Sequence, residues 1–244
     1  MGDRALAEEN PQFRESVVKT LRERNRLQRE IAAAAARLMA EDGAQCAQAK
    51  HMAAARLTGQ ARAAHGILPD NDQVEAALRE YLRTFGGAAH AALLLHLREL
   101  AVEWMDRLQT YAPHLVGAVL NGSATRHSHV HLNLYTESAK EVEMALLDRG
   151  VRIGVDLPTE RDLHAQEVIG FVVRAGVRGS RDQSTAILLT IYDPAALRVA
   201  PPSRARNADT LLHPIERCGR ASLPMMRQLL AETAASAQRP GHLA

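Results

Sequence analysis

The stretch HLVGAVLNGSATRHSHVHLNLY, residues 114–135, is where the pattern of the chain changes from helical to extended. Apolar and polar residues alternate in HVHLNLY, as they do on a strand with one buried face. Because HLVGAVL is almost wholly apolar, we expect a buried strand there that runs into a turn at Gly122 and Ser123. The stretch therefore predicts the start of a region that contains a sheet.

The segments on the N-terminal side of this stretch predict helices. Apolar residues recur at helical spacing, and glycines stand where helices would end. In one segment Asp72 and Glu75 have the spacing of a capping box. The polar segment 1–30, rich in Arg and Glu, predicts an arm or a marginal helix. The expected helices cover residues 30–42, 44–57, 72–85 and 89–111.

The segments on the C-terminal side predict a small α/β region. Ser138 opens a short helix, and the later runs VRIGV, EVIGFVVRAG and AILLTIYDP have strand character. The expected fold class is α+β: an N-terminal helical segment followed by a small mixed β-sheet domain with flanking helices. The expected divisions are an arm at 1–30, a helical region at 31–111, an α/β domain at 112–200, and a loop with a C-terminal helix at 201–244.

Composition excludes several classes of protein. The net charge of +2 over 244 residues does not favour nucleic acid as a partner, because such binding needs a clustered basic face. Cys46 and Cys218 are far apart and form neither a disulfide framework nor a zinc motif. No run approaches the ~18 apolar residues of a membrane helix, so we expect no membrane partner and a cytoplasmic location.

Gly122 and Ser123 predict a phosphate-binding turn. A glycine lets the backbone approach a phosphate, Ser123 offers an N–H and a hydroxyl, and Arg126 would neutralise charge. Asn-Gly is also a favoured hairpin turn, so a purely structural turn is the alternative.

Three histidines follow the turn at every second position: His127, His129 and His131. On a strand they would share one face, with alternate Cα atoms about 6.6 Å apart. Neutral imidazoles bind zinc, nickel, copper or iron, so a divalent transition metal is the cofactor that the pattern suggests. No fourth ligand can be named, and the alternative is the polar face of a half-exposed strand.

At this stretch the chain resembles the nucleotidyltransferases of the DNA polymerase beta superfamily. The shared features are a helix, a strand that ends in Gly-Ser, a nearby Arg and a following strand of the form x-h-x-L. The resemblance covers roughly residues 95–195, and within it Gly122, Ser123 and the two-residue repeat match. The helical front is similar to that of proteobacterial proteins that carry such a domain after a helical segment. The resemblance implies a nucleotidyltransferase-like α/β domain over residues 112–200.

The chain also departs from the pattern of that family, whose small bacterial members carry Asp-x-Asp after the Gly-Ser turn and a third carboxylate on a later strand. This chain has His129 and His131 at the two aspartate positions, and the later strand at 186–192 contains no acid. The interval from Ser123 to His129 is shorter than usual, so we expect the small helix after the turn to be reduced to a loop. Magnesium needs hard oxygen ligands, which imidazoles do not supply.

Three kinds of function are compatible with these residues. The first is a nucleotidyltransferase-like protein that binds a nucleotide or another phosphate ligand at the Gly-Ser turn, without standard two-metal catalysis. The second is a divergent nucleotidyltransferase, with carboxylates from Asp156, Asp182 or Asp193, or a transition-metal protein built on the histidines. The third is an interaction protein whose Leu-rich helix at 89–111 forms a homo-oligomer or docks a partner.

Overall fold

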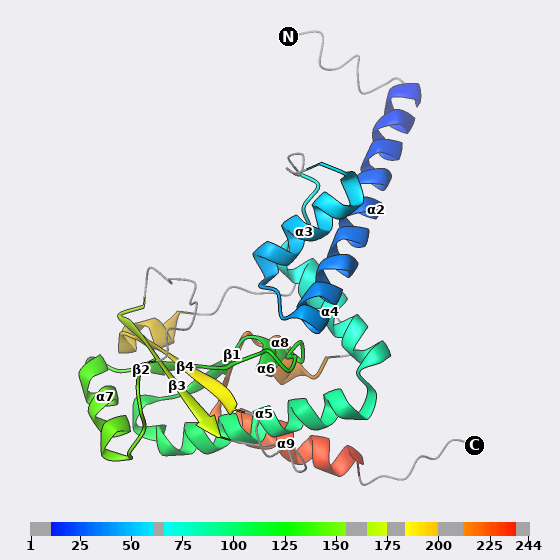
Figure 1. The fold of residues 1–244 in the computed structure, drawn as a ribbon. Helices are drawn as coiled ribbons and strands as arrows, with labels where there is room; N and C mark the ends of the chain where they lie inside the picture. Colours follow the sequence, from blue (N-terminus) through cyan, green and yellow to red (C-terminus); the bar gives the residue numbers. More distant parts are fainter. Residues whose placement is uncertain (1–10, 61–65, 155–164, 175–183, 200–211, 238–244) are drawn as a thin grey trace. The chain divides into compact units, whose positions relative to one another are not determined.

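The computed structural model describes residues 11–60, 66–154, 165–174, 184–199 and 212–237. The chain divides into two compact units, Met1–Thr84 and Phe85–Ala244. Each unit has its own set of secondary-structure elements, drawn in chain order in Figure 1. The boundary lies near the end of a predicted helix, and not at residue 111 where the sequence pattern changes.

The first unit consists of helices α2 (Pro11–Asp42), α3 (Cys46–Thr58) and most of α4 (Asn71–Phe85). Helix α2 runs through residue 30 without a break, so the polar arm and the Ala-rich helix are one element from Pro11 onward. Residues 1–10 lie outside the described residues. Alanines let these helices approach closely, because a methyl group adds little bulk. The buried residues between the helices include Ile31, Ala35, Ala49, Ala53 and Val74.

The ends of these helices follow the local sequence, with one correction. Gly59 closes α3 in the left-handed conformation with a φ of 68°, as predicted. The predicted capping box at Asp72 and Glu75 is wrong, because the reciprocal pair is formed two residues earlier. Asp70 Oδ1 accepts the Gln73 N–H at 2.7 Å, and Gln73 Oε1 accepts the Asp70 N–H at 2.9 Å.

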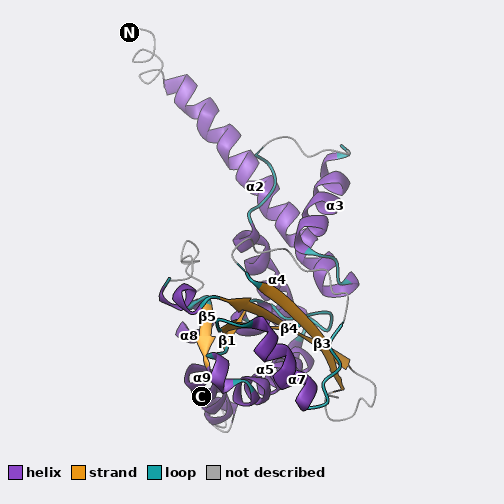
Figure 2. Cartoon of the chain, turned by 90° about the vertical axis from the view of Figure 1, so that its left-hand side faces the viewer, coloured by secondary structure: helices purple, strands orange, loops and turns teal. Residues whose placement is uncertain are grey.

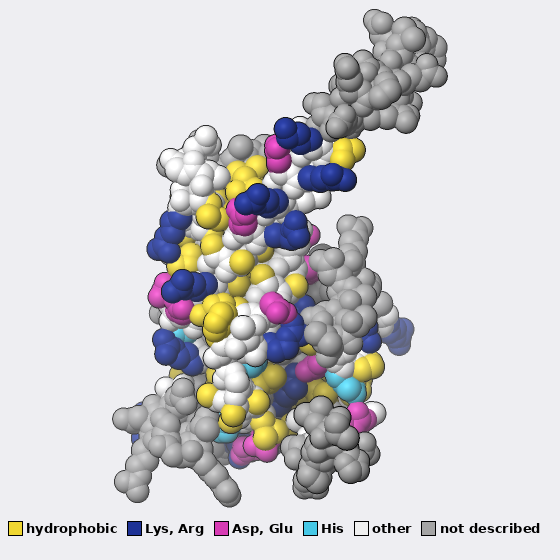
Figure 3. Space-filling view, turned by 90° about the vertical axis from the view of Figure 1, so that its right-hand side faces the viewer, with side chains coloured by type: hydrophobic (Ala, Val, Ile, Leu, Met, Phe, Trp, Pro, Cys, Tyr) yellow, Lys and Arg dark blue, Asp and Glu magenta, His cyan; other side chains and the backbone are white. Residues whose placement is uncertain are grey.

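Acidic and basic side chains alternate on the surface of the first unit. Arg26 pairs with Glu30 at 2.8 Å, and Arg37 pairs with Glu41 at 3.1 Å, each one helical turn apart. Figure 3 shows Lys and Arg side chains next to acidic ones along this part of the molecule. Such pairs are typical of a solvated helix face and contribute little to stability, because water screens them.

The second unit contains a five-stranded mixed sheet with the strand order β3-β4-β2-β1-β5. Strands β2 and β4 are parallel, and each of the other neighbouring pairs is antiparallel. The α+β fold class with a helical N-terminus is therefore confirmed. The strands are β1 (His114–Val116), β2 (Val130–Tyr135), β3 (Glu167–Arg174), β4 (Ser184–Tyr192) and β5 (Arg220–Ser222).

One face of this sheet packs against helices. Helices α5 (Gly87–Arg107) and α9 (Leu223–Ala237) lie on the same side of the sheet in Figures 1 and 2. The Leu-rich stripe predicted on α5 is buried there, and Trp104 lies with its ring centroid 4.6 Å from that of Phe171 on β3. The alternating apolar residues of β2, Val130, Leu132 and Leu134, have no exposed surface.

The helix predicted after Ser138 is confirmed, whereas two of the predicted strands are formed only in part. Helix α7 (Ala139–Asp148) begins after Ser138, whose hydroxyl oxygen accepts the Glu141 N–H, as expected of a cap residue. The predicted strand HLVGAVL is wrong in its second half: β1 ends at Val116, and residues Ala118–Asn121 form the short helix α6. Of VRIGV, the described residues 151–154 contribute an isolated bridge from Ile153 to Phe171, and Val155 lies outside the described residues.

The remaining described elements are short. The 3-10 turns η1 (Gln109–Tyr111) and η2 (Pro194–Arg198) follow α5 and β4, and helix α8 (Pro214–Arg217) precedes β5. Neither α8 nor β5 was predicted from sequence, because each is only three or four residues long. Among the helices that the structure describes, none combines the length and apolar character that crossing a bilayer requires.

Candidate functional site

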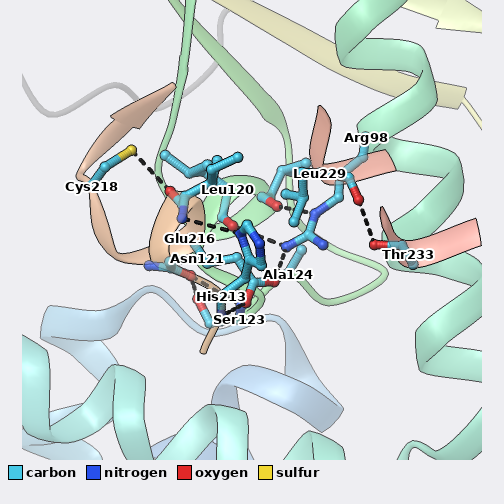
Figure 4. A network of polar contacts seen from close by, with 12 residues as sticks. Arg98, Leu120, Asn121, Ser123, Ala124, His213, Glu216, Cys218, Leu229 and Thr233 are labelled. Carbon is cyan, nitrogen blue, oxygen red and sulfur yellow. Dashed lines mark hydrogen bonds and ion pairs between the residues drawn. The ribbon is translucent and has the colours of Figure 1, made fainter. Parts of the chain in front are cut away.

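The Gly122-Ser123 turn closes helix α6. Gly122 has a φ of 80°, the left-handed conformation that favours glycine at a helix end. Asn121 Oδ1 accepts hydrogen bonds from the Ser123 N–H at 3.0 Å and from the Ser123 hydroxyl at 2.7 Å. Ser123 is 3% exposed. Both donors that were expected to meet a phosphate are thus engaged with Asn121 (Figure 4).

A buried arginine, Arg98, donates hydrogen bonds to the backbone just before this turn. Arg98 on α5 donates from Nε to the Val119 carbonyl at 3.1 Å and from Nη2 to the Leu120 carbonyl at 3.0 Å. The last carbonyls of a helix have no partner within the helix, so a guanidinium can satisfy them. Arg98 Nη2 also donates to Glu216 Oε1 at 2.6 Å, as Figure 4 shows. The arginine therefore joins α6 to the C-terminal part of the chain.

Glu216 is itself held in place by helix α8. Its Oε2 accepts the His213 N–H at 2.8 Å, while His213 Nδ1 accepts the Ile215 N–H at 3.2 Å, which makes a capping box. His213 Nε2 lies 2.8 Å from Glu232 Oε2 on α9. Sequence reasoning missed Arg98 and Glu216. Arg98 stands three and seven residues before the buried Ala101 and Met105, and a charge on an apolar helix face was the available signal.

The loop 124–129 leaves α6 and leads into β2. Ser128 Oγ accepts the Thr125 N–H at 2.9 Å, and the Thr125 carbonyl accepts the Ser128 N–H at 3.0 Å. His127 and His129 belong to this loop, since β2 begins at Val130. The expectation that three histidines share one strand is therefore wrong: only His131 lies within β2.

A cavity of about 320 Å³ opens beside this loop. It lies where β4 begins and β3 ends, next to the first half of α5. Its polar groups are one guanidinium, three imidazoles and four hydroxyls. None of the lining residues that the structure describes is Asp or Glu. The lining residues are Leu93, His96 and Leu97 of α5, Thr125, Arg126, His127, Ser128 and His129 of the loop, Val172 of β3, and Ser184, Thr185 and Ala186 of β4.

The predicted phosphate residues are thus divided between two places. Arg126 lines the cavity and is exposed, and its Nε donates to His127 Nε2 at 3.0 Å. Gly122 and Ser123 are not among the lining residues. Nearby, His90 Nε2 lies 3.0 Å from the Ala124 carbonyl and ties the start of the loop to α5. Arg126, His127 and His129 therefore line one cavity, whereas the Gly-Ser turn lies outside its lining.

His129 and His131 lie next to each other, with ring centroids 6.3 Å apart and planes tilted by 30°. Burial lowers the pKa of His129 below its ordinary value. Burial, followed by the charge of His129, lowers the pKa of His131 to about 4. Both imidazoles are neutral at pH 7, so they serve there as hydrogen-bonding groups and not as fixed positive charges.

The described residues do not assemble a metal site of three or more His, Cys, Asp or Glu side chains. Of the three carboxylates considered from sequence, Asp193 is exposed and its Oδ1 accepts the Ala195 N–H at 2.7 Å. It lies seven residues beyond Ala186, roughly 23 Å along the strand direction. Asp156 and Asp182 fall outside the described residues. The two histidines therefore have no carboxylate partner within the described part of the chain.

The Leu-rich face expected on α5 does not form an exposed docking surface. Leu97, Leu100 and Trp104 are at most 5% exposed and pack within the second unit. The apolar face that suggested a homo-oligomer is thus satisfied inside this chain.

The chain matches no family model, no curated protein and no solved structure.

Proposed function

We propose that this protein is a nucleotidyltransferase-like domain that binds a nucleotide or another phosphate-bearing ligand and lacks standard two-metal catalysis. The observation that carries the proposal is the lining of the cavity beside loop 124–129. Arg126, the imidazoles and the hydroxyls of Thr125, Ser128, Ser184 and Thr185 are the groups that bind phosphate oxygens in proteins.

The order of elements supports the proposed resemblance to the nucleotidyltransferases, but with a different alignment from the one expected from sequence. A strand, a glycine and a helix follow one another at β1, Gly117 and α6, and Gly117 has a φ of 73°. The Gly-Ser position of the family, at the end of the first strand, then corresponds to Gly117 and Ala118. This alignment adds five residues to the interval before His129 and puts a small helix directly after the glycine, which removes two of the departures noted from sequence. It also introduces one, because Ala118 stands where the family has its serine, and Gly122 and Ser123 are then no longer the matching residues.

The pairing of β2 with β4 adds evidence against two-metal catalysis. His131 pairs in register with Leu188 on the parallel strand β4. Residues 184–192 of that strand contain no acid, and the two positions of Asp-x-Asp hold His129 and His131. All three carboxylate positions of the family are then without an acid. Mg²⁺ binds few imidazoles and prefers oxygen ligands, so these positions do not support two-metal transfer.

Isothermal titration calorimetry with ATP, CTP, GTP and UTP, each with and without magnesium, tests the proposal. We expect binding of at least one nucleotide, and a loss of about tenfold or more in affinity in Arg126→Ala, which corresponds to about 1.4 kcal/mol. Lys140→Ala is the matched control, because Lys140 is exposed on α7 and carries the same charge. Absence of heat with all four nucleotides, at protein concentrations that detect millimolar affinity, overturns the proposal.

A further inference from the structure

We infer that the cavity takes the phosphate groups of its ligand free of magnesium, so that Mg²⁺ competes with the protein for the ligand. This inference rests on the proposed function and specifies the form of the ligand. It reverses the usual relation, in which the metal ion accompanies the nucleotide into the site.

The described lining of the cavity offers many hydrogen-bond donors and no carboxylate. Arg126 and the four lining hydroxyls are hydrogen-bond donors to phosphate oxygens, and the imidazoles can donate from one ring nitrogen each. A magnesium ion on the same phosphate occupies those oxygens and demands oxygen ligands of its own. The described lining has no carboxylate to supply them. The metal would therefore remove acceptors from the protein and gain no acidic ligand from the described lining in return.

The charge of the described lining also favours a ligand without the metal ion. Arg126 is the only permanently charged side chain among the described lining residues, and His129 is neutral at pH 7 because burial lowers its pKa. Magnesium reduces the charge of the nucleotide phosphates by two, which weakens their attraction to a guanidinium. In sites that bind the metal form, carboxylates offset the charge of the ion. Here an added divalent cation would lie beside a cation.

The test is the affinity for ATP in EDTA and in excess MgCl₂, measured by calorimetry at matched ionic strength. We expect binding to be at least about tenfold weaker with Mg²⁺, a change of about 1.4 kcal/mol. Inorganic sulfate, which holds Mg²⁺ weakly, is the control probe, and its affinity should change little. Equal or tighter binding of Mg-ATP overturns the inference and leaves the proposed function standing. No binding of any nucleotide in either buffer overturns the proposed function.

A second arm asks whether the lack of a carboxylate in the described lining causes the preference. The variant His129→Asp puts a carboxylate into that lining, and we expect it to bind ATP more tightly with Mg²⁺ than without. Circular dichroism and a thermal melt establish that the variant is folded. A folded variant that still prefers metal-free ATP contradicts the explanation. Arg126→Ala then tests the contribution of charge alone, since it should reduce the difference between the two buffers.

Discussion

The guanidinium of Arg98 lies 2.6 Å from Glu216 Oε1, and the two side chains are only 6% and 14% exposed. They are 118 residues apart in sequence. This pair connects α5, the carbonyls at the end of α6 and the capping box of α8. The loop that lines the cavity follows directly after α6, so its position depends on a contact with the C-terminal segment.

Removal of one partner of this pair should destabilise the second unit strongly. In Arg98→Met, Glu216 is left buried without its counter-charge and two carbonyls lose their donor. We expect a loss of about 3–5 kcal/mol in the free energy of unfolding, measured by urea denaturation. In the double variant Arg98→Met/Glu216→Leu the loss should be smaller than the sum of the two single losses. A loss in the double variant equal to the sum of the losses in Arg98→Met and Glu216→Leu would show that the pair is not coupled.

Stability should fall in mildly acidic solution, in part because of His131. Its pKa is lowered from 6.5 to about 4 in the folded state. The unfolded chain therefore takes up the proton first, and the contribution is complete above pH 6.5 and is lost as the pH falls toward 4. We expect this loss to be on the order of 2–3 kcal/mol, allowing for partial exposure.

The variant His131→Gln isolates this contribution, because an amide does not titrate in this range. Urea denaturation at pH 7.5 and pH 5 should show a smaller decrease in stability for the variant than for the parent. His127→Gln, with an exposed side chain, is the control and should behave like the parent. The same decrease in all three proteins would contradict the assignment to His131.

Gly117 and Gly122 should differ in their tolerance of alanine. Gly117 has a φ of 73° and a ψ of −152°, a region open almost only to glycine, whereas Gly122 has a φ of 80° and a ψ of 6°, the left-handed helical region. An added Cβ at Gly122 would lie 3.8 Å from Glu216 Oε1, an ordinary contact, and at Gly117 it would meet no atom within 4 Å. The cost in both cases is backbone strain.

We therefore expect Gly117→Ala to destabilise the protein by about 2–3 kcal/mol and Gly122→Ala by about 1–2 kcal/mol. Thermal melts of the two variants next to the parent give the order. A larger effect at Gly122 would mean that the C-terminal end of α6, and not the connection from β1 to α6 at Gly117, is the more constrained.

The protein should not release pyrophosphate from nucleoside triphosphates. Incubation with each of the four nucleotides and either Mg²⁺ or Mn²⁺, coupled to a pyrophosphatase and a phosphate assay, is the measurement. The physical reason is the absence of acids at positions 129 and 131 and along β4. Turnover that depends on the metal and disappears in Asp182→Asn would establish the alternative, a divergent enzyme with a carboxylate from outside the described residues.

Local patterns in the sequence predicted the elements whose causes are local. The alternation of HVHLNLY identified β2, and Ser138 marked the start of α7, because side-chain period and capping act over a few residues. HLVGAVL was misread because an apolar run fits a buried strand and a buried helix equally well. A glycine in a conformation with positive φ divides it at Gly117.

The candidate site was less predictable, since it depends on contacts between distant segments. The cavity joins α5, the loop before β2 and the first residues of β4, which the chain separates by roughly 30 to 60 residues. Arg126 was identified because it follows the turn directly. The closed Gly-Ser turn was not foreseen, although its cause is local: Asn121 stands two residues before Ser123, where an Asn side chain commonly accepts the backbone N–H, and its Oδ1 accepts both of the Ser123 donors.

The parallel pairing of β2 with β4 has a consequence for how this protein can change. It brings the starts of both strands to the same end of the sheet, so Ser184 and Thr185 line the cavity while the run from Ala186 to Leu189 is buried in the sheet. Ser184 and Thr185 stand at the margin of the strand, so we expect their substitution to leave the packing behind them unchanged. The ligand preference proposed for the cavity would then be adjustable by selection without a change in the stability of the fold.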